Sequence, residues 1–330
     1  MEFDVMYQTD VEVRNHIVDS YRGALTRDVS VGLTSSQKFI PSKYFYDARG
    51  SQLFEEICSL PEYYPTRTEM AILKSAAPEI MKSFDSGDIV ELGSGTNDKI
   101  RLLLDSMAPS NLPSLRYIPV DVSETAMNAA SEELAKIYPG LKVIGIVADF
   151  TVHLEAVPAD RTKLFILFGS TIGNFDEGMR MKFFRLVADT MNSGDRFIVG
   201  FDMIKSKETL ESAYNDSRGV TSEFNKNVLN VLNRELNADF RQSHFEHVAF
   251  FNENKERVEM HLRAKKRMSV NIDDLNLKVR LEKGETIHTE ICGKFSKEVI
   301  KDIAHEAGLN IKRWFSDSKE WFSLVEFAKE

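Results

Sequence analysis

The sequence predicts an α/β protein built on a mostly parallel β-sheet that helices cover on both faces. Three observations lead to this prediction. Short, almost continuously apolar segments alternate with segments of helical periodicity between residues 88 and 203. Strands this uniformly apolar are typical of parallel sheets, which are buried on both sides. The first four of these segments end in glycines or an acidic residue, at the sheet edge where ligands of such proteins bind.

The elements of this region follow one another in a regular order. A helix over residues 97–107 is expected after the first strand, because its apolar residues recur at three- and four-residue steps. Ser123 is a candidate N-cap for a second helix, whose apolar face runs from Met127 to Ile137. Residues 179–191 have the pattern of a third helix. The five expected strands are 88–95, 116–123, 142–150, 163–174 and 195–203.

The flanking segments do not continue this alternation. Residues 1–67 mix helix and loop, and residues 205–240 have a wholly helical pattern. Residues 245–293 alternate with period two, which predicts antiparallel strands joined by turns such as NENKE. A helix and two strands are expected after residue 296. The sequence therefore predicts two lobes, one made of residues 68–204 and 294–330 and the other of residues 1–67 and 205–293.

Composition narrows the class of protein. The chain has 330 residues, enough for one large domain or two ordinary ones, and a formal net charge of −9. This charge disfavours a nucleic-acid binder that neutralises phosphates, so no nucleic-acid partner is expected. No membrane span or secretory signal is apparent. The two cysteines, Cys58 and Cys292, form no disulfide framework, so a reducing cytoplasm is the expected location.

The strand ends indicate a ligand. The turn at Gly93 lets the backbone approach a ligand closely, but Asp98 stands where a dinucleotide-binding fingerprint would have its third glycine. Asp121 ends the next strand and is suited to ribose hydroxyls, and Asp149 and Phe150 at the third strand end are suited to an adenine. Each aspartate alone would be explained as a helix cap. Together, without a pyrophosphate motif, these groups favour S-adenosylmethionine over NAD.

Other candidate residues have ordinary alternatives. Asn174, in the loop after the fourth strand, could orient an amine or carboxylate, although a loop asparagine is more often a turn former. Tyr63 and Tyr64 lie between prolines and could pack between the lobes. The seven histidines show no metal-ligand spacing apart from His244 and His247, which are expected at the surface. No metal site is predicted.

The chain resembles the bacterial and fungal L-histidine Nα-methyltransferases of ergothioneine biosynthesis, a class I S-adenosylmethionine-dependent group. The resemblance runs from about residue 20 to the end of the chain. Its motifs include KYFYDARGSQLFEEI, LPEYYPTRTE, ELGSGTNDK, IPVDVS, ADF, FGSTIGNF, AYNDSRGVTSEFNKNVLNVLNRELNADF, VEMHLRA and TEICGKF. It implies a Rossmann-like, seven-stranded, mostly parallel sheet with a second α+β lobe that binds the substrate.

The resemblance also implies roles for individual residues. The cofactor S-adenosylmethionine would be bound by Tyr46, Gly93, Lys99, Asp121, Ala148, Asp149, Phe150, Gly169 and Ser170. The substrate would be bound by Tyr63, Asn174, Tyr214, Met260, Glu290, Ile291 and Cys292. Tyr63, Asn174 and Tyr214 would surround the α-amine and carboxylate, Glu290 and Cys292 would reach the imidazole, and Tyr63 and Asn174 would be catalytic.

One residue departs from the pattern of the family. These enzymes usually have a serine two residues after the glutamate, and this chain has Cys292. A thiol is a weaker hydrogen-bonding group than a hydroxyl, so histidine binding would be weakened and a tryptophan-like substrate stays open. The resemblance implies three successive methyl transfers to histidine, giving the betaine hercynine. The expected substrate is a small-molecule amino acid, and a monomer is expected, although no motif in the sequence bears on the oligomeric state. A methyltransferase of protein or RNA, and a silent binding module, are the rival hypotheses.

Overall fold

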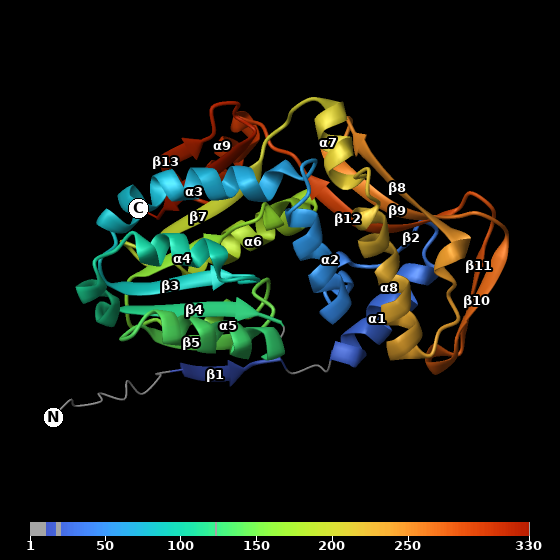
Figure 1. The fold of residues 1–330 in the computed structure, drawn as a ribbon, viewed down its shortest axis with the longest axis horizontal. Coiled ribbons are helices and arrows are strands. Elements are labelled where there is room, and N and C mark those ends of the chain that lie inside the picture. Colours follow the sequence, from blue (N-terminus) through green and yellow to red (C-terminus); the bar gives the residue numbers. More distant parts are fainter. Residues whose placement is uncertain (1–10, 18–20, 123, 330) are drawn as a thin grey trace.

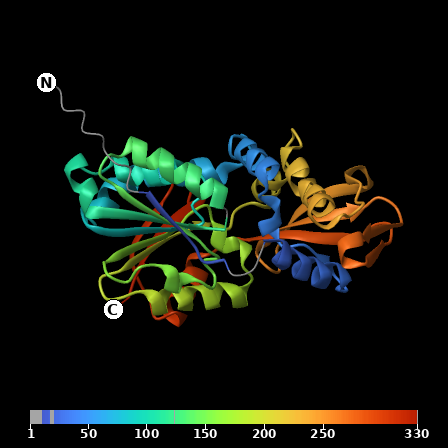
Figure 2. The same ribbon diagram turned by 90° about the horizontal axis from the view of Figure 1, so that it is seen from below.

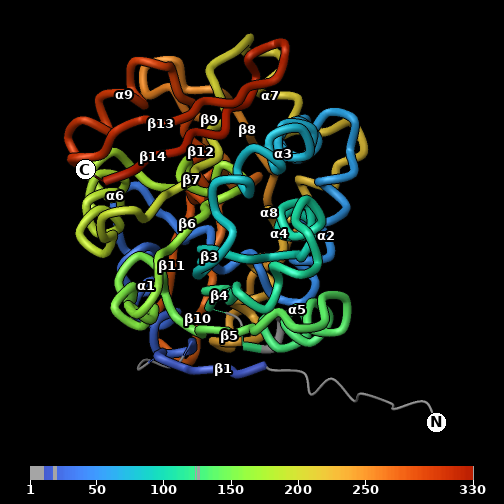
Figure 3. Tube along the Cα trace, turned by 90° about the vertical axis from the view of Figure 1, so that its left-hand side faces the viewer, coloured from blue at the N-terminus to red at the C-terminus, as the bar shows by residue number. Residues whose placement is uncertain are grey.

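The computed structural model describes residues 11–17, 21–122 and 124–329, which form two lobes side by side (Figure 1). The larger lobe is built on an eight-stranded sheet, and Figure 3 shows its strands from β1 at the bottom to β13 at the top. In that order they are β1 (Val11–Asn15), β5 (Lys142–Val147), β4 (Leu115–Asp121), β3 (Gly87–Leu92), β6 (Lys163–Leu167), β7 (Arg196–Asp202), β14 (Phe322–Ala328) and β13 (Asn310–Ser316).

The sheet is parallel from β1 to β7, and only β14 and β13 run antiparallel to their neighbours. The expected mostly parallel sheet is confirmed, with one strand more than the expected seven. The additional strand is β1, which pairs with β5 from Val11↔Val143 to Asn15↔Val147. These residues were expected in the other lobe, so that part of the predicted boundary is wrong. Their mixture of half-buried and exposed positions suits an edge strand, and a strand of five residues is too short to reveal its partner.

Helices cover both faces of this sheet (Figure 2). Adjacent strand residues enter different cores: Ile89 packs with α3, α4 and α5, whereas Val90 packs with α6 and α9. This explains why the strands are apolar throughout. The helices are α3 (Tyr64–Lys82), α4 (Asp98–Asp105), α5 (Glu124–Ile137), α6 (Glu177–Thr190) and α9 (Lys297–Glu306). The expected N-cap of α5, Ser123, lies outside the described residues.

The smaller lobe contains a four-stranded sheet in the order β2-β12-β9-β8 and a two-stranded ribbon, β10-β11. Its strands are β2 (Lys38–Phe39), β8 (Phe245–Asn252), β9 (Arg257–Ala264), β10 (Met268–Ile272), β11 (Leu277–Leu281) and β12 (Thr286–Gly293). Its helices are α1 (Tyr21–Thr34), α2 (Ala48–Cys58), α7 (Lys207–Tyr214) and α8 (Val220–Leu236). The expected hairpin around NENKE is confirmed as β8-β9.

The expected helical segment at 205–240 forms two helices. Asp216 lies in the turn between α7 and α8, and its carboxylate accepts hydrogen bonds from the backbone N–H groups of Val220 and Thr221. These bonds satisfy the first N–H groups of α8, whose N-cap residue Gly219 has a φ of 76°, and this turn explains the break. Short 3-10 turns complete the fold: η1 (Ser42–Phe45), η2 (Pro109–Ser114), η3 (Leu154–Ala156), η4 (Thr171–Asn174), η5 (Gln242–His244) and η6 (Asp273–Leu275). Among the described helices, none is long and apolar enough to cross a lipid bilayer.

Candidate active site

The glycine turn after β3 lies against the aromatic ring that follows β5. Gly93 has a φ of 74°, and a Cβ atom at this position would lie 3.4 Å from Cε1 of Phe150. Gly93 is exposed and Phe150 half-buried, so both can face a ligand. Glycine is required here because the positive φ strains other residues. The structure therefore brings together two of the residues that the sequence analysis assigned to the cofactor.

Asp121 and Asp149 end neighbouring strands at the same edge of the sheet. The backbone N–H of Ala148 donates to the carbonyl of Asp121, 2.9 Å away, which joins the two strand ends. Oδ1 of Asp149 accepts hydrogen bonds from the N–H and hydroxyl of Thr151, at 2.9 and 2.6 Å. These bonds fix a local turn, and the Asp149 carboxylate caps no α-helix. Both aspartates are half-buried.

Lys99 is held in place by Glu69, a fully buried residue of α3. Nζ of Lys99 lies 2.6 Å from Oε2 of Glu69. The same carboxylate accepts two hydrogen bonds from the backbone N–H of Gly169, at 2.8 and 2.9 Å. A Cβ atom at Gly200 would lie 2.4 Å from Oε1 of Glu69, so the strand below has no room for a side chain. Glu69 thus joins two predicted cofactor residues.

The two lobes touch where η4 meets the end of β12. A Cβ atom at Gly173 would lie 2.9 Å from the carbonyl oxygen of Gly293 and 3.3 Å from Sγ of Cys292. The next residue, Asn174, is half-buried, and its side chain makes no hydrogen bond within the part of the chain that the structure describes. The hydroxyl of Ser170 accepts a hydrogen bond from the N–H of Asp202. Asn174, predicted to bind the substrate amine, and Cys292, predicted to bind the imidazole, therefore flank a contact between two backbone segments.

Three tyrosines gather beside Glu290 and Cys292. The rings of Tyr63 and Tyr214 contact edge to face, with centroids 6.1 Å apart. Burial raises the pKa of both hydroxyls well above the ordinary value, so both stay protonated at neutral pH. Tyr46 as a residue is 43% exposed, and its hydroxyl interacts electrostatically with Glu290 and Cys292. Tyr46, assigned to the cofactor from the sequence, therefore adjoins the predicted substrate residues.

Glu290 faces this group because of a β-bulge in β12. His288 pairs with His261 of β9, whereas Glu290 pairs with the adjacent residue Met260, so the pairing shifts at Thr289. Successive residues of a strand point to opposite faces. Without the bulge, Glu290 would share a face with His288 and point away from the predicted substrate residues.

The other substrate residues predicted on these strands divide between the two faces. Cys292 and Met260 share the face of Glu290, and Ile291, paired with Glu259, lies on the other.

Buried polar groups hold the bulge in place. The Thr289 hydroxyl lies 2.7 Å from Oδ1 of Asn225 and 3.0 Å from the carbonyl oxygen of Met260. Nδ2 of Asn225, a fully buried residue of α8, lies 2.8 Å from Nδ1 of His247. Nε2 of His247 in turn lies 2.9 Å from the carbonyl oxygen of Tyr214. The expectation that His247 lies at the surface is wrong: it is half-buried and links β8 to a predicted substrate residue.

Burial also sets the charge of Glu290. It raises the pKa of the Glu290 carboxyl to about 7, and the nearby Lys294 ammonium counteracts the rise. A carboxyl with this pKa can accept a hydrogen bond from an imidazole N–H as an anion or donate to an imidazole nitrogen as an acid. The arrangement therefore suits a partner that titrates in the same range, as imidazole does.

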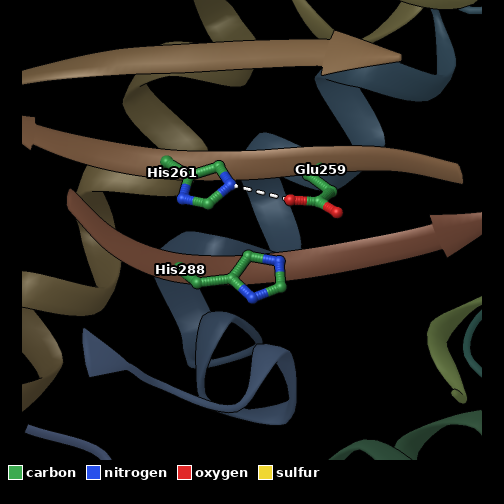
Figure 4. A group of neighbouring side chains, drawn as sticks. All are labelled: Glu259, His261 and His288. Atoms are coloured by element: carbon green, nitrogen blue, oxygen red, sulfur yellow. Dashed lines mark hydrogen bonds and ion pairs between the residues drawn. The ribbon is translucent and has the colours of Figure 1, made fainter. Parts of the chain in front are cut away.

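A cluster of Glu259, His261 and His288 lies on the face of the small sheet opposite to Met260 (Figure 4). Nε2 of His261 lies 3.2 Å from Oε2 of Glu259, and the two histidine rings stack with centroids 4.6 Å apart and planes at 19°. Imidazole lone pairs lie in the ring plane, so stacked rings do not direct them at one ion. Arg257 also pairs with Glu259 at 2.8 Å. We interpret the cluster as a stacked, hydrogen-bonded group and propose no metal there.

Several polar residues that support the site were not predicted from the sequence. Glu69 has a recognisable signal, since it is an acid on the apolar face of α3, three and seven residues before Ile72 and Ala76. Asp202 ends an apolar strand as Asp121 does, and could have been found by the same argument. Lys294 and Asn225 gave no such signal, because only the fold brings their partners near.

The order of the strands, β5-β4-β3-β6-β7-β14-β13 with β14 and β13 antiparallel, is that of a class I S-adenosylmethionine-dependent methyltransferase. Comparison with known proteins agrees: residues 25–329 match the model of the family described as histidine-specific methyltransferase, S-adenosylmethionine-dependent. The chain belongs to this family.

Individual relatives cover most of the chain. It is 44% identical over 307 residues to the histidine N-alpha-methyltransferase of Mycolicibacterium smegmatis. This match covers 93% of this chain and 95% of that protein. It is 41% identical over 321 residues to the protein of the same name in Mycobacterium tuberculosis, at 97% and 99% coverage. A 4-dimethylallyltryptophan N-methyltransferase of Penicillium roqueforti is 26% identical over 189 residues, at 53% and 55% coverage.

Proposed function

We propose that this protein transfers methyl groups from S-adenosylmethionine to the α-amine of L-histidine, and that three successive transfers give the trimethylated betaine, hercynine. The family membership and the two mycobacterial relatives support this reaction. The observation that carries the choice of histidine is the bulge at Thr289, which directs Glu290 toward Tyr214 and Tyr46. A carboxyl in this position suits an imidazole better than an apolar ring.

The residues present fit S-adenosylmethionine. The exposed turn at Gly93 leaves room for a ligand beside the ring of Phe150, and Asp121 lies on the next strand as a candidate acceptor for ribose hydroxyls. Lys99, fixed by Glu69, lines the same edge of the sheet at Gly169. When bound, S-adenosylmethionine supplies an electrophilic methyl group. No covalent intermediate on the protein is then required.

The protein's own part is to hold a neutral amine in line with that methyl group. Alignment of this kind can contribute about 7–11 kcal/mol to the barrier reduction. The amide oxygen of Asn174 and the hydroxyl of Tyr63 can each accept a hydrogen bond from the amine. Because the pKa of Tyr63 is raised by burial, its hydroxyl is a poor general base at neutral pH. We infer that the amine releases its proton to solvent and that Tyr63 orients the nitrogen.

Mass spectrometry tests the reaction directly. The purified protein is incubated with S-adenosylmethionine and each of the twenty amino acids in turn, and the products are weighed. Histidine is expected to gain three methyl groups. The variant Tyr63→Phe should lower turnover strongly with little loss of folding, and a variant with full turnover would remove Tyr63 from the mechanism. Methylation of another amino acid with inert histidine would contradict the substrate assignment.

A tryptophan-like substrate is the second candidate, and two observations favour it. The thiol of Cys292 stands at the predicted imidazole subsite, and the Penicillium relative is named for a tryptophan derivative. The incubation with twenty amino acids distinguishes the two substrates. We also propose that the protein acts as a monomer in the cytoplasm. Its two cysteines are both free thiols, which a reducing compartment would preserve.

A further inference from the structure

Lys294, the residue after β12, is buried at the junction of the two lobes. Its side chain is 0% exposed, and its Nζ atom has three partners. It lies 2.7 Å from Oδ2 of Asp202, 3.0 Å from the hydroxyl oxygen of Tyr214 and 3.1 Å from Sγ of Cys292. Two of these partners, Tyr214 and Cys292, belong to the predicted substrate residues. Lys294 therefore links the end of β7 to that group.

The buried charges around Lys294 do not balance. A second ammonium, that of Lys205, lies 2.5 Å from Oδ1 of Asp202 and donates to the hydroxyl of Tyr64 at 2.8 Å. Among the described residues, Asp202 is the one carboxylate within 4.0 Å of either lysine. Two ammoniums share this one contacting carboxylate. The buried Glu290 carboxyl also interacts with Lys294 but, with a pKa of about 7, is only partly ionised at neutral pH, so an excess of positive charge remains. Such a charge is costly unless an anion comes near it.

The bond to Lys294 also orients the hydroxyl of Tyr214. An ammonium group can only donate, so the Tyr214 oxygen accepts the hydrogen bond. The tyrosine's own proton must then point away from Nζ, where the Cys292 thiol is an acceptor within reach. A thiol is a weak acceptor, so a ligand carboxylate would take this hydrogen bond in its place. The backbone carbonyl of Tyr214 is bound by His247, which fixes the residue from its other side. A positive charge and an oriented hydroxyl donor together form the usual recognition site for a carboxylate.

We propose that Lys294 is a positioning residue of a carboxylate subsite, which it builds by orienting the Tyr214 hydroxyl and by supplying the buried positive charge. This inference rests on the proposed function and deepens it, because it explains selection of an α-amino acid over the corresponding amine. The ligand class is a small molecule with a carboxylate on the carbon that bears the methylated nitrogen. Asp202 keeps the ammonium in place from the larger lobe.

A pair of ligands tests the proposal. Calorimetry measures the affinities of L-histidine and of histamine, which has the same imidazole and amine but no carboxylate, for the wild type and for Lys294→Met. The variant is expected to lose at least about tenfold in affinity for histidine, as for a charge-assisted hydrogen bond, and little for histamine. Lys205→Met is the matched control. It removes a buried ammonium that is bound to Asp202 but does not contact Tyr214. The ratio of the affinities for histidine and histamine should therefore change less in Lys205→Met than in Lys294→Met.

Equal losses for both ligands in Lys294→Met would overturn the proposal, because they would indicate a purely structural role. Tyr214→Phe keeps the ring and is expected to show the same selective loss. The double variant should lose less than the sum of the two single losses, because both substitutions remove the same oriented hydroxyl donor. If Lys294→Met does not fold, Lys294→Gln and Tyr214→Phe decide the question. If the wild type does not bind histidine, the proposed function fails, and the same comparison is made with tryptophan and tryptamine.

Discussion

Glu290 and His288 lie on opposite faces of β12 although a single residue separates them. In a regular strand, residues two apart share a face. Here the bulge at Thr289 places His288 beside His261, on the face that carries the stacked histidines, and places Glu290 beside Met260, among the tyrosines. One inserted residue therefore places the cluster of Glu259, His261 and His288 on one face of the sheet and the predicted substrate residue Glu290 on the other.

The bulge should depend on the Thr289 hydroxyl. Thr289→Val keeps the shape of the side chain but leaves the buried Oδ1 of Asn225 without its 2.7 Å partner. We expect the free energy of unfolding to fall by about 1–3 kcal/mol and KM for histidine to rise more than kcat falls. Urea denaturation and steady-state kinetics measure the two effects. Thr286→Val, on the same strand, removes only a 3.4 Å contact with Gln37 and is the control. An unchanged KM in Thr289→Val would contradict the role assigned to the bulge.

Glu69 should govern the affinity for S-adenosylmethionine without touching it. In Glu69→Gln, Lys99 loses its carboxylate partner at 2.6 Å, and one of the two bonds from Gly169 loses its acceptor oxygen. We expect the Kd for S-adenosylmethionine to rise at least about tenfold, measured by calorimetry. Glu79→Gln changes an exposed residue of the same helix and should leave the Kd unchanged. Equal affinities in Glu69→Gln and the wild type would show that the ion pair only supports the fold.

Glu91 should make stability depend on pH. Burial raises the pKa of this β3 carboxyl from 4.5 to about 8, while a hydrogen bond from Tyr117 opposes the rise. The folded state then holds the proton more tightly than the unfolded state. Its stabilising contribution is complete below pH 4.5 and is lost as the pH rises through 8. Glu91→Gln cannot titrate, so the wild type should lose stability relative to this variant between pH 5 and pH 8.5. Parallel denaturation curves at all pH values would contradict the buried neutral carboxyl.

Cys292→Ser should strengthen histidine binding. The resemblance of the sequence implies a serine at this position, and a hydroxyl would be a better partner for Lys294, whose Nζ lies 3.1 Å from the thiol. One neutral hydrogen bond is worth about 0.5–1.5 kcal/mol, so KM for histidine should fall by a factor of about 2–10. Kinetics with histidine and tryptophan test this. A gain for tryptophan instead would mean that the thiol disfavours the larger ring.

Much of the fold followed from local patterns in the sequence. The apolar segments, their helices and the hairpin at NENKE have the expected positions, because each is determined by hydrophobic periodicity or turn residues. The strand ends of the larger lobe also assigned Gly93 and Phe150 to one ligand, and the structure places these two residues side by side. The partner of β1 was not predictable, since an edge strand of five residues carries no information about its neighbour.

The supporting residues of the site depend on contacts that a local pattern does not encode. Lys294 is separated from Asp202 by more than ninety positions in the numbering and from Tyr214 by eighty. The bulge is hidden for another reason: a regular strand and a bulged strand have the same composition, and only the pairing with β9 reveals the extra residue. Tyr63, Tyr214 and Glu290 could be assigned to one group only through the resemblance to a family.

The contact between Gly173 and Gly293 has a consequence for the size of the substrate. Asn174, at the proposed amine end, and Cys292, at the proposed imidazole end, are each the chain neighbour of one of these glycines. Their separation is set by how closely two bare backbones approach. The contact between Gly173 and Gly293 would thus limit the length of the amino acid that fits between Asn174 and Cys292, without contacting the substrate itself. The substitution Gly173→Ala would push the two backbone segments apart, because its Cβ atom would lie 2.9 Å from the carbonyl oxygen of Gly293. The site of this variant would then favour a longer substrate.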